Sequence, residues 1–358
     1  MSGQRKVQVL VVEDSPVVQE LLVHTINQDP RLEVAAVAPS AEAALRLMGK
    51  VKPDVVSLDI RLPGMNGLEA TKRIMREHPL PIVVVAADVH GGDMNISMNA
   101  LRAGALSVVE KPGSLSRADY AAVARHLCGQ LFAMSQVKVI RQRFATAAPP
   151  PPRPAAAPPP VATDAPHRFE VVALVASTGG PNALVKVLNG LPSGFPLPVL
   201  VVQHIGASFV GGFAAWLGTV CPLPVELAEH GAQPRPGHVY VAPGDSHMEA
   251  GRAVLRLTRG APVCGQRPSG DVLFQSLADA FGPAAIGVLL TGMGEDGARG
   301  LLAMREAGAY TIAEDASTAV IHGMPGEAVR LGAATEELPL PRVAPRLLDL
   351  LASKGGSQ

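Results

Sequence analysis

Short apolar runs alternate along the first part of the chain with longer stretches whose apolar residues recur every three or four positions. The short runs predict buried strands, and the longer stretches predict amphipathic helices. The expected strands are 7–12, 32–37, 55–58, 82–86 and 105–109. Because a helix is expected after each strand, this region is predicted to form a small parallel, doubly wound α/β domain.

The same alternation of short apolar runs and helical stretches returns beyond residue 168, with more strands than in the first region. Strands are expected at 169–176, 197–203, 239–242, 247–250, 253–258, 285–291 and 310–313. Helices are expected at 181–189, 209–217, 272–281, 298–307 and 343–352. This pattern predicts a second doubly wound α/β domain.

An Ala- and Pro-rich segment, 145–166, separates the two patterned regions. Proline lacks a backbone N–H and fixes φ, so this segment is predicted to be an extended, polyproline-like linker. A loop inside one domain is a weaker alternative, because structureless loops of this length are uncommon in compact folds. The predicted division is a first domain at 5–128, a helical extension at 129–144, the linker, and a second domain at 167–353.

Composition limits the partners and the location of the chain. The 358 residues are 47% hydrophobic and 17% charged, which suits two buried cores. With 31 basic and 31 acidic residues the formal net charge is +0, so nucleic acid and anionic membrane surfaces are not expected partners. The start of the chain resembles neither a signal peptide nor a membrane span, and a cytoplasmic location is expected. The scattered Cys128, Cys221 and Cys264 argue against a disulfide framework or a zinc site.

Acidic residues stand where strands of the first domain are expected to end. Glu13 and Asp14 follow the first strand and Asp59 follows the third, while Lys111 follows the fifth. Carboxylates gathered at one sheet edge repel each other unless a cation joins them, and oxygen ligands suit Mg²⁺. Asp59 can then attack a phosphoryl group while Lys111 pairs with the transferred oxygens.

This order of motifs resembles a bacterial response-regulator receiver domain. The matching motifs are Glu13-Asp14, the stretch from Asp59 to Gly67, and Lys111-Pro112. The resemblance implies a flavodoxin-like fold, Asp59 as phosphoacceptor, Glu13 and Asp14 as Mg²⁺ ligands beside Asp59, and Lys111 as their cationic partner. It also implies a sensor histidine kinase as phosphodonor.

Two positions depart from the receiver pattern. Receivers usually carry Ser or Thr at the end of strand four and an aromatic residue three positions before the lysine, where this chain has Ala86 and Val108. A phosphoryl group therefore gains fewer contacts that differ between the two states of the switch. Phosphorylation is expected to change the conformational equilibrium less than in a receiver with these side chains.

Three residues of the second domain follow expected strands. Ser177 follows 171–176, His204 follows 198–203, and Asp296 follows 285–291 by a few residues. The carboxyl ends of parallel strands meet at one edge of a sheet, so these residues are expected to converge as nucleophile, base and orienting acid. Taken alone, Ser177 fits a helix cap better than a nucleophile. Among the other histidines, the serious alternatives to His204 as the base are His238, His247 and His322.

The loop 291–297 also allows a second interpretation. Gly292, Gly294 and Gly297 spell the dinucleotide-binding pattern GxGxxG between a strand and a helix. Glu295 and Asp296, however, place negative charge where a pyrophosphate has to lie. The esterase interpretation is favoured, with Asp296 facing His204 and the Met293 N–H facing a developing oxyanion.

Five motifs of the second domain are similar to the catalytic domain of the CheB family of chemotaxis protein-glutamate methylesterases. They lie at 176–181, 202–205, 236–245, 267–269 and around Gly292. The resemblance implies a Rossmann-like domain, the triad Ser177, His204 and Asp296, Met293 as an oxyanion donor, and Thr178 beside the nucleophile.

The same resemblance implies a function and a mode of regulation. The expected reactions are hydrolysis of glutamyl γ-methyl esters on methyl-accepting chemoreceptors, with release of methanol, and deamidation of receptor glutamines. The expected ester hydrolysis needs no cofactor, and phosphorylation of a receiver that shields the site raises activity. The alternative is a regulated binding module whose α/β domain is catalytically idle, in which case Ser177→Ala leaves cellular function intact.

Overall fold

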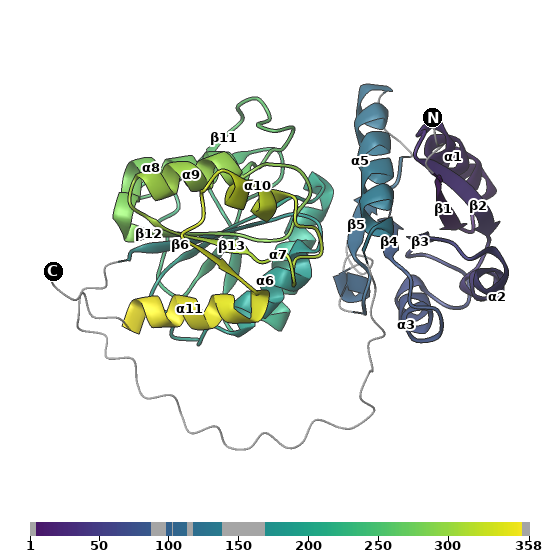
Figure 1. Ribbon diagram of the computed structural model, residues 1–358, viewed down its shortest axis with the longest axis horizontal. Helices are drawn as coiled ribbons and strands as arrows, with labels where there is room; N and C mark the ends of the chain where they lie inside the picture. The colour runs from purple at the N-terminus through teal and green to yellow at the C-terminus, as the bar shows by residue number, and fades with distance from the viewer. Residues whose placement is uncertain (1–4, 87–97, 102, 113–116, 138–168, 353–358) are drawn as a thin grey trace, which may run out of the picture.

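The computed structural model describes residues 5–86, 98–101, 103–112, 117–137 and 169–352. Within them the chain forms two α/β domains, and helix α5 (Arg117–Ser135) of the first domain lies between the two sheets (Figure 1). The predicted linker and the part of the predicted extension beyond residue 137 lie outside the described residues. α5 continues across residue 128, so the end of the first domain and the start of the extension form one helix.

The first domain is built on a five-stranded parallel sheet with the strand order β2-β1-β3-β4-β5. Its strands are β1 (Val7–Val12), β2 (Leu32–Ala38), β3 (Val55–Asp59), β4 (Ile82–Ala86) and β5 (Ser107–Glu110). Its other helices are α1 (Pro16–Gln28), α2 (Ala41–Val51) and α3 (Gly67–Glu77). Every residue of β3 and β4 is buried, as expected for central strands covered by helices on both faces.

Local sequence signals explain where these helices begin. Pro16 occupies the first turn of α1, where the missing N–H costs nothing. Ser40 Oγ caps α2 by accepting from the Ala43 N–H at 3.2 Å, and Asn66 caps α3 in the same way.

The second domain is built on a seven-stranded sheet with the order β14-β13-β12-β6-β7-β9-β8. The strands are β6 (Val171–Ala176), β7 (Val199–Gln203), β8 (Val225–Leu227), β9 (Val239–Val241), β12 (Ala285–Leu289), β13 (Tyr310–Glu314) and β14 (Glu336–Leu338). All pairs in this sheet are parallel. The chain starts at β6 in the middle, extends to β7 on one side and later to β12 on the other, so a topological switch point lies beside β6.

Helices cover both faces of this sheet. α6 (Gly180–Asn189), α7 (Ala207–Val220) and α11 (Leu340–Ala352) pack in one buried cluster, whereas α8 (Gly270–Phe281), α9 (Ala298–Glu306) and α10 (Met324–Arg330) pack in another (Figure 1). The antiparallel strands β10 (His247–Ala250) and β11 (Leu255–Thr258) form a separate hairpin. The prediction of two doubly wound, parallel-sheet domains is confirmed.

The short elements β8, α10 and β14 are absent from the sequence prediction, as is the 3-10 helix η1 (Gly282–Ala284). β8 and β14 have three residues each and contain no buried residue, so they carry no strand-length apolar run. α10 has seven residues and contains both Pro325 and Gly326, which are poor helix formers. The predicted strand 105–109 in fact begins at Ser107.

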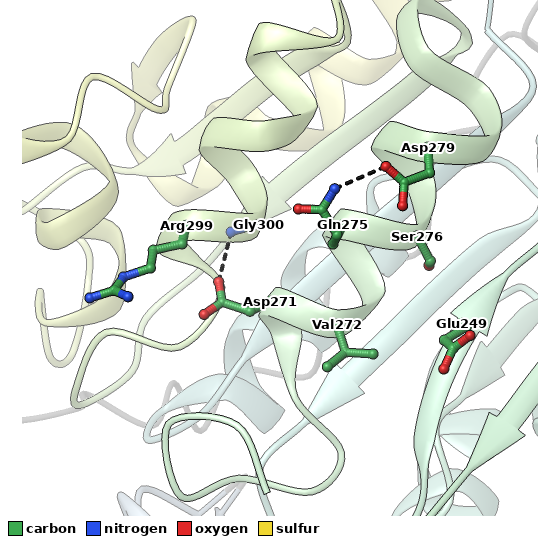
Figure 2. A pocket seen from close by; sticks show the side chains of 8 residues that line it. All are labelled: Glu249, Asp271, Val272, Gln275, Ser276, Asp279, Arg299 and Gly300. Atoms are coloured by element: carbon green, nitrogen blue, oxygen red, sulfur yellow. Dashed lines mark hydrogen bonds between the residues drawn. The ribbon is translucent and has the colours of Figure 1, made fainter. Parts of the chain in front are cut away.

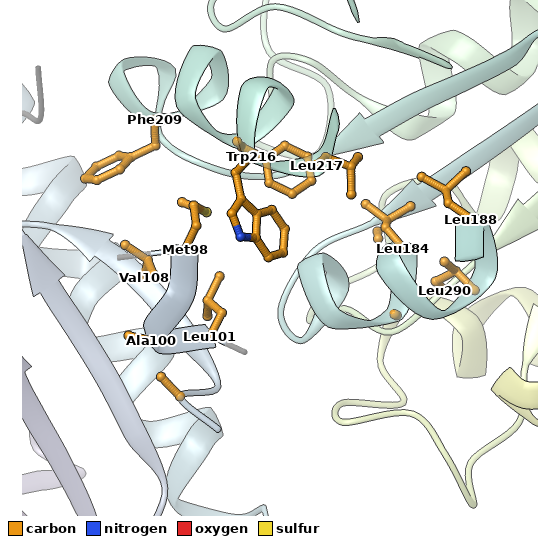
Figure 3. Close-up of a cluster of buried hydrophobic side chains, with 14 of the residues drawn as sticks. Met98, Ala100, Leu101, Val108, Leu184, Leu188, Phe209, Trp216, Leu217 and Leu290 are labelled. Carbon is orange, nitrogen blue, oxygen red and sulfur yellow. The ribbon is translucent and has the colours of Figure 1, made fainter. Parts of the chain in front are cut away.

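The two domains share one buried apolar cluster. Met98, Leu101 and Val108 of the first domain pack with Phe209 and Trp216 of the second. Figure 3 shows the Trp216 ring beside Met98 and Leu101. Two polar contacts join the same surfaces: Asn182 Nδ2 donates to the Leu101 carbonyl at 3.0 Å, and Gln130 of α5 pairs with Thr178. The first domain therefore covers the end of the second sheet where β6 and β7 terminate.

Candidate active site and receiver site

Ser177 and His204 lie next to each other because β6 and β7 are paired. Ala176, the last residue of β6, is opposite Gln203, the last residue of β7. The His204 N–H donates to the Ala176 carbonyl at 3.0 Å, and the Ser177 N–H donates to the Thr291 carbonyl at 3.0 Å. Both side chains line the same small pocket.

His204 and Asp296 form a direct hydrogen bond. His204 Nε2 lies 2.8 Å from Asp296 Oδ2, and the side chains are 4% and 3% exposed. A carboxylate accepts but does not donate, so Nε2 carries the proton and Nδ1 retains its lone pair. Nδ1 is buried and has no hydrogen-bond partner among the described residues. Nδ1 therefore keeps a free lone pair inside the pocket that Ser177 also lines, and Ser177 Oγ makes no hydrogen bond with it.

The turn after β6 requires two glycines. Gly179 has φ of +78°, and a Cβ there would lie 2.7 Å from Val320 Cβ. A Cβ on Gly180 would overlap the Gln203 side-chain oxygen. Gln203 Nε2 donates to the carbonyls of Ser177, at 2.8 Å, and His204, at 3.0 Å. These contacts hold the two strand ends together, and the sequence prediction does not include Gln203.

Thr178 and Met293 both lie on the side of the site that faces α5. Thr178 Oγ1 accepts from Gln130 Nε2 at 3.0 Å and lies 3.2 Å from Gln130 Oε1. Met293 Cε lies 3.6 Å from the position that a Cβ on Gly129 would take. The Met293 N–H donates no hydrogen bond within the described part of the chain.

The other candidate histidines make no hydrogen bond with Ser177, His204 or Asp296 among the described residues. His238 Nδ1 lies 2.9 Å from Glu226, and His322 Nε2 lies 3.5 Å from Glu337. His247 Nε2 lies 3.0 Å from the Ala261 carbonyl. Within the described residues, Asp296 therefore pairs with His204 and with none of the three alternatives.

The dinucleotide interpretation of the loop 291–297 finds no support at the start of α9. The Gly300 N–H donates to Asp271 Oδ1 at 2.7 Å, so a carboxylate occupies a place where a phosphate would have to bind (Figure 2). Asp271 also lines an open hollow of about 390 Å³ over α8 and α9, which contains no member of the triad.

The pocket at the triad is closed by the first domain. It has a volume of about 20 Å³, which is room for about one water molecule. Ser177, Thr178 and His204 line it from one side. The first domain contributes the other side, formed by Leu101, Leu106, Ser107, Val108, His126 and Gln130. A glutamyl side chain cannot enter this arrangement.

The predicted receiver site is also assembled. Lys111 Nζ lies 2.7 Å from Glu13 Oε2 and 2.8 Å from Asp59 Oδ2. Burial, followed by the nearby charge of Asp59, raises the pKa of Glu13, although the hydrogen bond from Lys111 opposes the shift. Glu13, Asp14 and Asp59 each offer an oxygen, and the three oxygens lie within 4.8 Å of one another. These hard oxygen donors fit Mg²⁺.

The two positions that depart from the receiver pattern are buried. Ala86 lies at the end of β4 and is opposite Glu110 of β5. Val108 packs in the cluster between the domains (Figure 3).

Among the helices of the described residues, none combines the length and apolar character that a bilayer crossing requires.

Comparison with known proteins gives matches for both domains. Residues 172–347 match the family model described as CheB methylesterase, and residues 9–121 match that of the response regulator receiver domain. The chain is 52% identical to protein-glutamate methylesterase/protein-glutamine glutaminase 2 of Paramagnetospirillum magneticum, over 97% of this chain and 98% of the relative.

A second relative and a solved structure are also similar to the chain. The chain is 45% identical to protein-glutamate methylesterase/protein-glutamine glutaminase 1 of Syntrophus aciditrophicus, over 97% of this chain and 99% of that protein. The crystal structure of the Thermotoga maritima CheB methylesterase catalytic domain is 35% identical with a TM-score of 0.49, and the match covers 51% of this chain and 98% of that one.

Proposed function

The chain belongs to the family of CheB methylesterases with a response-regulator receiver domain, and we propose that it hydrolyses glutamyl γ-methyl esters of chemoreceptors and deamidates receptor glutamines with Ser177 as the nucleophile. The observation that carries this proposal is the 2.8 Å bond between His204 Nε2 and Asp296, which leaves Nδ1 as a base in the pocket that contains Ser177.

In the proposed reaction, Ser177 Oγ attacks the γ-carbonyl carbon and His204 Nδ1 takes the hydroxyl proton. Asp296 stabilises the resulting imidazolium, and the Met293 N–H donates to the oxyanion. The imidazolium then protonates the leaving oxygen, and methanol departs to leave an acyl-enzyme. A water deprotonated by His204 attacks the acyl-enzyme, and His204 returns the proton to Ser177 Oγ as the bond to the receptor glutamate breaks. With a glutamine substrate, ammonia leaves in place of methanol.

Thr178 is proposed to hold the turn that carries the nucleophile Ser177 in place. Its hydroxyl is paired with Gln130 of the receiver, and its carbonyl accepts from Thr291 Oγ1 at 2.9 Å. These bonds tie the turn after β6 both to the loop that carries Met293 and to the covering domain.

The receiver is proposed to control access to the triad. A sensor histidine kinase supplies a phosphoryl group to Asp59, and Lys111 pairs with its oxygens. Glu13, Asp14 and Asp59 would hold Mg²⁺, which offsets the negative charge of the carboxylates and the phosphoryl group. Since Lys111 bonds both Glu13 and Asp59, phosphorylation of Asp59 alters a contact at the end of β5. β5 leads into the surface that covers the triad, and the altered contact of Lys111 favours separation of the two domains.

Two further features support the proposed location and the proposed way of recognising the receptor. The three cysteines, all within the described residues, are free thiols, which fits the cytoplasm as the proposed location. The zero formal net charge leaves recognition of the chemoreceptor to local contacts instead of long-range attraction.

Release of methanol and of ammonia tests the proposal. Receptor carrying glutamyl methyl esters, or unmodified glutamines, is incubated with the wild type or with Ser177→Ala. We expect the variant to lose both activities by about 10³-fold or more, with circular dichroism unchanged. Full hydrolysis by Ser177→Ala would reject the nucleophile and favour another site. Absence of hydrolysis by the phosphorylated wild type would favour the idle binding module.

A further inference from the structure

Asp296 lies over the start of α8, and its carboxylate accepts several hydrogen bonds there besides the one from His204. Ser269 Oγ donates to Oδ1 at 2.6 Å, and the Asp271 N–H donates to the same oxygen at 3.2 Å. The Gly270 N–H donates to Oδ2 at 2.6 Å. The acid of the triad is therefore fixed by a helix end that is remote from it in sequence.

This contact depends on a close approach of two backbones. A Cβ on Gly270 would lie 2.5 Å from Val175 Cγ1 and 3.2 Å from the Gly297 Cα. Glycine at 270 lets the first turn of α8 reach the loop that carries Asp296. The start of α8 is thus built to meet this carboxylate.

Ser269 is held from both sides. It is fully buried, and its hydroxyl accepts from the Val272 N–H at 3.4 Å as the N-cap of α8. Its own N–H donates to His247 Nδ1 at 3.2 Å, while His247 Nε2 donates to the Ala261 carbonyl at 3.0 Å. Because a carbonyl only accepts, His247 carries its proton on Nε2 and offers Nδ1 as the acceptor that Ser269 needs.

We propose that Ser269 is a positioning residue of the esterase, whose hydroxyl fixes the Asp296 carboxylate toward His204, and that His247 holds Ser269 in place. The hydrogen bonds then run from His247 through Ser269 and Asp296 to His204. This inference rests on the proposed triad and extends it by two buried residues from β10 and the start of α8.

A role limited to capping α8 does not account for the distances. The bond that a cap requires, from the Val272 N–H, is the longer one at 3.4 Å, and the bond to Asp296 is the shorter at 2.6 Å. A hydrogen bond from a hydroxyl to a carboxylate is charge-assisted and stronger than one between neutral groups. The Ser269 hydroxyl is directed mainly at the triad.

The electrostatics of Asp296 agree with this arrangement. Burial acts to raise the pKa of its carboxyl, but the hydrogen bonds from His204, Ser269 and the Gly270 N–H hold the pKa below its usual range. Asp271 and Cys264 also lie near the carboxylate, and His126 of α5 faces His204 from the receiver. Removing the Ser269 hydroxyl takes away one hydrogen bond that compensates the negative charge of Asp296, and the less compensated charge favours the imidazolium of the nearby His204.

The test compares full-length Ser269→Ala with the wild type, in methanol release from methylated receptor under phosphorylating conditions. We expect kcat to fall about 10- to 100-fold with KM unchanged, because the acid and the base lose their alignment. We also expect the acid limb of the kcat/KM profile to move to higher pH, by about half a unit or more. A purely structural role predicts no such shift.

Three further variants complete the design. Ser269→Thr keeps a hydroxyl and is expected to recover most of kcat. Ser269→Gly removes the hydroxyl but costs a helix cap only about a few tenths of a kcal/mol, so it separates the effect on Asp296 from loss of the cap. Ser276→Ala removes another hydroxyl of α8, one that accepts from the Ala250 N–H, and is expected to keep the wild-type kcat and pH profile.

The inference is overturned if Ser269→Ala and Ser269→Gly, corrected for folded fraction, show the kcat and pH profile of the wild type. The same holds if they match Ser276→Ala. Ser177→Ala, assayed alongside, distinguishes failure of the Ser269 positioning role from failure of the proposed triad. If it is inactive while Ser269→Ala is normal, only the positioning role fails. If Ser177→Ala is active, the proposed triad itself fails.

Discussion

At the scale of single residues, the position of one carboxylate decides which nitrogen of His204 keeps a free lone pair. Asp296 accepts from Nε2, so Nδ1 carries no proton and faces the site without a partner among the described residues. The same ring with its proton on Nδ1 would be a donor toward Ser177 and useless as a base. The proposed catalytic power of His204 is thus set by its neighbour.

Asp296→Asn tests this point. An asparagine keeps the shape of the side chain but can turn its amide N–H₂ toward Nε2, which stabilises the wrong tautomer of His204. We expect kcat for methanol release to fall about 10³- to 10⁴-fold, and the thermal unfolding temperature to fall as well, because the amide would face the Gly270 N–H that Oδ2 accepts from. Asp279→Asn, a carboxylate of α8 that pairs with Gln275, is the matched control and is expected to be normal. Equal activity of the two variants would contradict the proposed role of Asp296.

At the scale of elements, the strand-to-helix turn after β6 has no room for a side chain at Gly179 or Gly180. Gly180 begins α6, and its hydrogen atoms face the Gln203 side chain that holds the Ser177 and His204 carbonyls. The helix start and the ends of β6 and β7 are therefore packed against one another without space for a methyl group.

Gly180→Ala is expected to destabilise the second domain by about 1–3 kcal/mol, because the new Cβ overlaps Gln203 and lies 2.8 Å from Ala176 Cβ. Activity is expected to fall with it, since Gln203 has to move. Gly211→Ala is the opposite case: it lies in α7 with no atom near its Cβ position, so a gain of about 1 kcal/mol is expected. Urea unfolding measures both. A tolerant Gly180→Ala would show that this turn is not closely packed.

The sequence predicts the long central strands well and the short edge strands poorly, and the difference has a physical reason. Central strands such as β6 and β7 are continuous apolar runs, and the rule that parallel strand ends share one edge predicts the convergence of Ser177, His204 and Asp296. The three-residue strands β8 and β14 carry no such run. Contacts of Asp296 with Ser269, or of Thr178 with Gln130, depend on how remote elements pack, and no periodic pattern records them.

At the scale of the whole molecule, the receiver acts as a cover over the triad. Met98, Leu101 and Val108 supply apolar contact with α7, and Gln130 supplies a buried polar contact with Thr178. Val108 occupies the place of the usual aromatic switch residue, within the interface itself (Figure 3). With Ala86 at the end of β4, the phosphoryl group lacks one hydroxyl contact, so we expect a modest activation ratio.

Gln130→Ala tests the polar part of the cover. Loss of the Gln130 side chain removes the partner of the Thr178 hydroxyl. This weakens the closed state, in which the receiver covers the site, by about 1 kcal/mol, and raises the population with separated domains about fivefold. We expect basal methanol release to rise by that factor, with a change in the emission of Trp216, the one tryptophan of the chain. Gln136→Ala, whose side chain is exposed beyond the end of α5, is the control. An unchanged basal rate would show that this contact does not hold the domains together.

The central claim is that a Ser-His-Asp hydrolase site lies beneath a receiver that uncovers it when Asp59 is phosphorylated. The most direct measurement is the rate of methanol release from methylated receptor with and without acetyl phosphate and Mg²⁺. It is made on the wild type, Asp59→Asn and Ser177→Ala. The account predicts a low rate that the phosphodonor raises in the wild type, a low and unresponsive rate in Asp59→Asn, and none in Ser177→Ala. A wild-type rate that is high without phosphodonor and unaffected by it, or hydrolysis by Ser177→Ala, would contradict the account.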